Sequence, residues 1–138
     1  MSRYCSYADL TARVDEGVLL QQQGEETAPT DGYGAFAQSI EDASAEIDGY
    51  LARRFAVPLV GEPPALVRKL AADIAVYNLF SRKGFALAKE AEDAIVAKRY
   101  DDAIAYLRMV AEGKAEIPDL LPVGREDRRF VVVGLSRG

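Results

Sequence analysis

The sequence predicts an all-α protein, a small helical bundle of about four helices with an extended C-terminal arm that carries one short β-strand. Over most of residues 1–113, apolar residues recur every three or four positions, as on one face of a helix. Glycines and prolines divide these stretches from one another. The one run typical of a strand is FVVV at residues 130–133. We therefore expect a helical domain over residues 1–113 and an arm over residues 114–138.

The composition is typical of one soluble globular domain. The chain has 138 residues, 49% hydrophobic and 28% charged, enough for a core of its own. Its net charge of -5 argues against binding nucleic acid through a basic face. The single cysteine, Cys5, excludes an internal disulfide and a cysteine-based metal site. No apolar run is long enough to span a membrane or to serve as a signal peptide, so we expect a protein made in the cytoplasm.

The first expected helix is short and is followed by a long loop. Ser6 and Asp9 are spaced as in a capping box, with aspartate in place of the usual glutamate. The helix should continue through Leu10 and Val14. Residues 21–34 (QQQGEETAPTDGYG) are polar and contain glycines and a proline, which predicts a surface loop.

Two longer helices joined by a proline-rich turn should form the centre of the fold. Prolines between residues 57 and 64 end the first helix, and the pair Pro63-Pro64 suits the start of the second. The second helix is apolar nearly all round and must be covered on several sides, so we expect its cover to include another chain. The apolar stripe of the first helix comprises Phe36, Ile40, Ala43, Ile47, Tyr50 and Leu51.

One ion pair is expected between these two helices. Arg54 lies near the apolar stripe in the last turn of the first helix, where a cation is favoured by the helix dipole. Asp73 lies on the flank of the next helix. Because the two helices return past one another, we expect Arg54 and Asp73 to pair.

The last helix should run from about residue 87 to residue 112, and Gly113 should close it. Beyond it, residues 117–122 are expected to be extended. A lone strand cannot pair within one chain, so we expect the arm to add to a sheet formed with other subunits or with a partner. A disordered tail is the alternative. The residues assigned to partner binding are Arg128, Arg129, Phe130, Val131, Val132 and Val133.

The sequence offers no catalytic, cofactor-binding or metal site. It contains no histidine, the commonest general base and metal ligand. The acids Glu41, Asp42, Glu46 and Asp48 are too spread around a helix to converge and are expected on a solvated face. The tyrosines at helical spacing are expected in the core or at an interface rather than stacking on bases. They are Tyr50, Tyr77, Tyr100 and Tyr106.

Several segments together resemble a family of structural proteins of Mu-like phages and prophages. They are residues 45–51 (AEIDGYL), 53–59 (RRFAVPL), Pro63-Pro64 with Asp73 and Tyr77, and residues 98–104 (KRYDDAI). Tyr7, Asp9, Leu10 and Arg13 extend the match at the N-terminal side, so the resemblance covers about residues 4–122. The residues that recur in this motif are expected to form the fold, and the family supplies no catalytic residue to transfer.

The resemblance implies a head–tail connector (adaptor) protein of a tailed phage. Such a protein would form a homo-oligomeric ring below the portal protein, with the portal's twelvefold symmetry, in the neck of the virion. It would extend the DNA channel, without sequence-specific binding, and dock the tail or a stopper or terminator protein. A stopper or tail-completion protein of the neck is the near alternative. A free-standing cytoplasmic helical interaction module and an enzyme with an unusual acid pair are the others.

Overall fold

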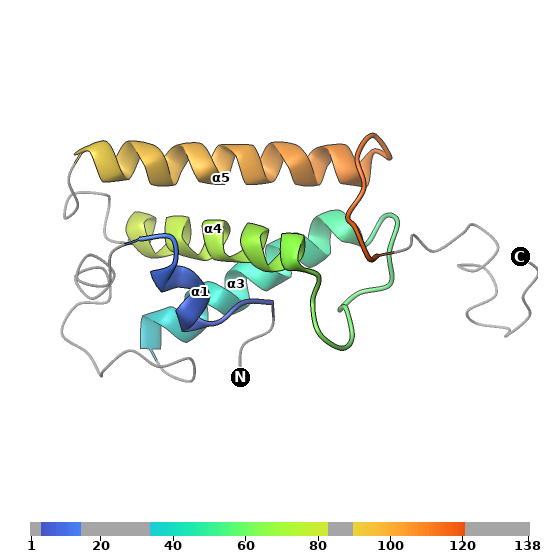
Figure 1. The fold of residues 1–138 in the computed structure, drawn as a ribbon, viewed down its shortest axis with the longest axis horizontal. Coiled ribbons are helices and arrows are strands. Elements are labelled where there is room, and N and C mark those ends of the chain that lie inside the picture. The colour runs from blue at the N-terminus through green and yellow to red at the C-terminus, as the bar shows by residue number, and fades with distance from the viewer. Residues whose placement is uncertain (1–3, 15–33, 83–89, 121–138) are drawn as a thin grey trace, which may run out of the picture.

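A computed structural model of the chain describes residues 4–14, 34–82 and 90–120. These residues form four helices, α1 (Tyr7–Thr11), α3 (Gly34–Leu51), α4 (Ala65–Arg82) and α5 (Glu90–Ala111), and contain no strand (Figure 1). The predicted all-α class is confirmed, and the helices lie where the sequence places them. The strand expected at residues 130–133 lies outside the described residues.

The helix α4 is the centre of the fold. In Figure 1 it lies between α5 on one side and α1 with α3 on the other, and it runs antiparallel to α5. It packs against all three. Residues 70–76 are buried without interruption, including Leu70, Ile74 and Val76. The expectation that α4 needs another chain to cover it is wrong, because α1, α3 and α5 surround it within one chain.

The helix α3 packs against α4 through the face that the sequence predicts. Phe36, Ile40, Ile47 and Leu51 are each at most 2% exposed. Tyr50 is only half-buried, at the edge of this face. The α3 face is therefore confirmed as the second main contributor to the core.

The short helix α1 begins at the predicted cap. The backbone N–H of Ser6 donates to the Asp9 carboxylate at 2.9 Å, which satisfies a donor that the helix leaves free. Leu10 and Val14 are buried. The ring of Tyr7 meets Phe36 edge-on with centroids 4.9 Å apart, so α1 is held against the start of α3.

The buried Asp73 has partners other than the one expected. Its two carboxylate oxygens lie 3.1 Å from Arg13 Nε and 3.1 Å from Lys69 Nζ. Arg54 instead donates to the backbone oxygen of Val110. The expected Arg54–Asp73 pair is wrong because Asp73 lies about 12 Å along α4 from Ala65, well past the level of the α3 end.

A stack of tyrosines joins three helices. The rings of Tyr77 on α4 and Tyr100 on α5 are 3.9 Å apart and nearly parallel. The Tyr100 hydroxyl donates to Glu46 on α3 at 3.1 Å. Burial, and then the hydrogen bond to the Glu46 carboxylate, raise the pKa of Tyr100 to about 12.

Replacing Asp73 by asparagine tests the buried ion pairs. Asp73→Asn should lower the free energy of unfolding by about 1–3 kcal/mol, because it removes a buried charge that two cations approach. The matched control is Asp102→Asn, which loses an exposed pair with Lys98 and should cost no more than about 0.5 kcal/mol. Urea denaturation measures both values. If both variants lose the same small free energy of unfolding, the buried ion pairs of Asp73 stabilise the fold no more than the exposed Lys98–Asp102 pair does.

The raised pKa of Tyr100 predicts a loss of stability at high pH. The unfolded chain loses the Tyr100 proton near pH 10, whereas the folded chain holds it to about pH 12. This group therefore stabilises the fold below pH 10, and that contribution disappears as the pH rises from 10 through 12. Tyr100→Phe should make the decline of stability between these pH values less steep, as measured by denaturation at a series of pH values. If Tyr100→Phe leaves the slope of unfolding free energy against pH unchanged, the decline is not caused by the raised pKa of Tyr100.

Candidate docking groove

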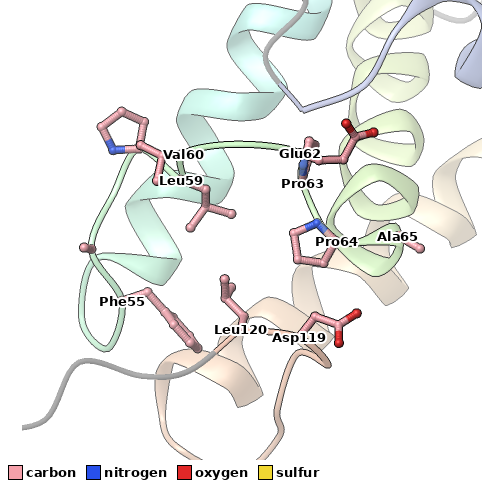
Figure 2. A pocket seen from close by; sticks show the side chains of 11 residues that line it. Phe55, Leu59, Val60, Glu62, Pro63, Pro64, Ala65, Asp119 and Leu120 are labelled. Carbon is pink, nitrogen blue, oxygen red and sulfur yellow. The ribbon is translucent and has the colours of Figure 1, made fainter.

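The described part of the chain is hollowed at the end of the bundle where α3 stops and α4 starts. The hollow is an open groove of about 560 Å³, a volume within the range of roughly 300–1,000 Å³ found for binding pockets (Figure 2). One wall is the connection between α3 and α4, and the other is the segment that follows α5. The lining residues are Phe55, Ala56, Pro58, Leu59, Val60, Glu62, Pro63, Pro64, Ala65, Asp119 and Leu120.

Tyr4 fixes the first wall through two hydrogen bonds. The Tyr4 hydroxyl accepts a hydrogen bond from the backbone N–H of Leu59 at 2.8 Å and donates one to Asp48 Oδ1 at 2.6 Å. Tyr4 is only 3% exposed. The N-terminal segment thus ties the connection to α3, and the proline content of the connection limits its backbone freedom further. The Val57–Pro58 peptide bond within this wall is cis.

The second wall begins where α5 ends in a Schellman motif. Gly113 has a φ of 82°, which favours glycine. Its N–H bonds to the Val110 oxygen at 3.0 Å, and the N–H of Lys114 bonds to the Met109 oxygen at 2.7 Å. The chain therefore reverses sharply after α5 and returns along the end of the bundle.

Two side chains fasten this returning segment. Arg54 Nη1 donates to the backbone oxygens of Val110 at 2.9 Å and Ala115 at 3.4 Å. The Tyr106 hydroxyl donates to the backbone oxygen of Glu116. Arg54, in the turn that follows α3, thus binds both the last turn of α5 and the start of the second wall.

A turn then places Leu120 at the groove. The backbone N–H of Leu120 bonds to the Ile117 oxygen at 3.1 Å, and Ile117 is 2% exposed. Pro118 occupies the second position of the turn, and Asp119, with a φ of 70°, the third. Proline followed by a positive φ is the pattern of a type II turn. The buried Ile117 anchors the turn, and Leu120 faces the other wall.

The groove has an apolar floor and an acidic rim. Figure 2 shows Phe55, Leu59 and Leu120 pointing toward one another from the two walls. Glu62 and Asp119 contribute carboxylates, and no lysine or arginine is among the lining residues. Glu62 lies 3.6 Å from Arg68, yet its side chain is 83% exposed. Such a surface suits an apolar segment flanked by positive charge.

The residues that the sequence assigns to partner binding, 128–133, lie outside the described residues. The acids of α3 do not converge: Asp48 and Glu46 each accept a tyrosine hydroxyl, and Asp42 accepts from the Gln38 amide at 2.8 Å. Within the ranges that the structure describes, no group of side chains could hold a metal ion. Cys5 is buried.

The tyrosines lie where they were expected to, within the packing. Tyr50, Tyr77, Tyr100 and Tyr106 are all partly buried and pack against the core. They therefore contribute to the fold. None of them lines the groove.

Sequence reasoning missed the groove. Its signal was present in the connection, where the apolar residues Val57, Leu59 and Val60 lie beside Pro58 and outside any helix. Helical periodicity does not explain such residues, and Val60 is 91% exposed. An apolar side chain in a rigid, non-helical segment was the available indication of a contact surface.

Replacing Arg54 tests whether it fastens the second wall. Arg54→Ala should lower the free energy of unfolding by about 1.5–3 kcal/mol, because it leaves backbone oxygens near α5 without a charged donor. It should also speed amide hydrogen exchange in residues 113–120. The control Arg108→Ala removes an exposed cation from the last turn of α5 and should change exchange there far less. Equal exchange in both variants would show that Arg54 is not what holds the segment.

Comparison with known proteins gives a family. The family model described as Bacteriophage Mu, Gp36 matches residues 4–122, which include the four helices and both groove walls. No curated protein matches the chain. Among the described residues, no helix is long and apolar enough to cross a lipid bilayer. The match covers most of the sequence, and the chain therefore belongs to the bacteriophage Mu Gp36 family and is a Mu-like phage protein.

Proposed function

We propose that this chain is a virion structural protein of the head–tail connector (adaptor) type. In this proposal its copies form a ring below the portal, with the portal's twelvefold symmetry, and this ring extends the DNA channel and docks the tail. Family membership gives the phage context. The groove beside the start of the arm is the observation that best supports the proposal, because it offers apolar side chains to a partner at the end of a bundle whose described core is buried within one chain.

The proposed role needs no catalysis and no cofactor. The described polar clusters serve the fold: Asp73 pairs with Arg13 and Lys69, and Arg54 binds backbone oxygens. The net charge of -5 suits a channel wall that DNA passes without adhering. A stopper or tail-completion role in the same neck is the second candidate, since it would use the same groove and arm.

Removing the arm tests the assembly role. A chain lacking residues 124–138 should keep its helical circular dichroism, because the described core ends at residue 120, but it should be lost from phage particles. Removing only residues 136–138 is the control and should leave incorporation intact. Quantitative mass spectrometry of purified particles measures both. Normal incorporation of the longer truncation would contradict the proposed use of the arm.

Electron microscopy of the particles tests the position in the neck. The connector proposal expects a ring of this chain in direct contact with the portal. A ring separated from the portal by another protein would favour the stopper or tail-completion role. Absence of the chain from the neck would overturn both.

A further inference from the structure

We propose that the groove is the acceptor for residues 128–133 of a second copy of this chain. Each copy would give its arm to one neighbour and receive an arm from the other. This inference rests on the ring proposed above and names the contact that would build it.

The shapes of the two partners match. In an extended segment, alternate side chains point to the same side, so Phe130 and Val132 would face the groove together. The floor offers the apolar side chains of Phe55, Leu59 and Leu120. The exposed Val60 would be covered in the same contact.

The charges of the two partners also match. Glu62 and Asp119 are the charged residues of the groove lining. Two cations lie next to the lining: the Arg54 guanidinium is 5.6 Å from the Phe55 ring, and Arg68 is 3.6 Å from Glu62. In the arm, Arg128 and Arg129 directly precede the apolar run. Glu126 and Asp127 come just before these arginines, so an arm bound with its apolar residues on the floor would bring the arginines, which are nearer in sequence to the apolar run, toward Glu62 and Asp119.

The arm is long enough to reach a neighbour. It leaves the described structure at Leu120, beside the groove. The 13 residues from Leu121 to Val133 span up to ~45 Å when extended. A domain of about 100 residues has a radius of gyration of about 13 Å and is therefore on the order of 30 Å across. The arm of one copy can thus cover the distance to the groove of the next.

A donor segment and an acceptor groove on different parts of one chain form a heterologous interface, the kind that closes into rings. The acceptor is also fastened before binding, by Tyr4 on one wall and Arg54 on the other. Little of the binding free energy is therefore needed to order the groove.

Cross-linking between two differently sized chains tests the contact. The acceptor chain carries Val60→Cys, and the donor chain carries Val132→Cys and a larger affinity tag; Cys5, which is buried, stays in both. A short thiol-reactive cross-linker is added to the mixture of purified full-length chains. We expect a product with the summed mass of the two chains, and the unsubstituted chain controls for reaction at Cys5.

The matched control moves the acceptor cysteine to Ala94→Cys. Ala94 is exposed and belongs to the first turns of α5. The start of α5 lies at the opposite end of the bundle from the start of α4, where the groove is (Figure 1). Its cross-linking to the donor should be at least about tenfold weaker, because only bound partners raise the local concentration of the two thiols. Equal yields from both positions would show random collision and overturn the proposal.

Charge reversal tests the rim. Glu62→Lys in the acceptor should reduce the yield, and the donor changes Arg128→Glu and Arg129→Glu should restore it. Failure of the donor changes to restore the yield would overturn the assigned orientation of the arm.

A single chain with both Val60→Cys and Val132→Cys tests the competing arrangement, in which the arm binds its own groove. Cross-linking within this chain, with no product between the two separate chains, would overturn the second copy as the occupant. No product in either experiment would overturn the groove as the acceptor.

Two outcomes separate this contact from the proposed function. If the cross-linked product forms but the protein is absent from phage necks, the connector function alone is overturned. If the protein is present in necks but no cross-linked product forms, the arm contact alone is overturned.

Discussion

The burial of α4 is the constraint on which the rest of this structure depends. Its residues 70–76 have no exposed face, so three other helices must lie around it. This arrangement buries the carboxylate of Asp73, the one charged side chain among the buried residues that the structure describes. Arg13 and Lys69 each approach one of its two oxygens, and Arg99 in turn donates to the backbone oxygen of Arg13 at 2.9 Å. The N-terminal segment is thus joined to α4 by charge and to α5 by a hydrogen bond, and the core is closed within one chain.

A closed core changes where contacts with other molecules can form. The sides of the bundle offer little, since the large apolar side chains exposed in the described residues are Val60, Ile95 and Met109. The end of the bundle is different, because there the chain reverses twice and neither reversal is helical. Both reversals are fastened by side chains that bind backbone atoms, Tyr4 at Leu59 and Arg54 at Val110. Hydrogen bonds of this kind fix a backbone without filling the space above it, and an open groove remains.

The helices could be predicted from the sequence, but the segments and side chains that they contact could not. The stripe from Phe36 to Leu51 and the cap at Ser6 follow from periodicity and local hydrogen bonding, and both were predictable. Periodicity shows that a face is buried but not what buries it, which is why the cover of α4 was assigned to another chain. The partner of Arg54 could not be read for a similar reason: its acceptors at Val110 and Ala115 are backbone oxygens, which every residue type offers. The groove needs two segments more than 50 residues apart in the chain, and no local pattern joins them.

A core that is closed within one chain and an arm proposed to carry the contact residues would suit a subunit that folds before it assembles. The closed core allows a single copy to fold without exposing the apolar face of α4, which would otherwise favour aggregation. In the proposed ring, one arm in one groove is a small contact and is weak on its own. Each copy in a closed ring is held by two such contacts, and both must open before it can leave. Closure of the proposed ring would therefore turn weak, reversible contacts into a stable assembly through effective concentration, while a free subunit at low concentration would stay monomeric.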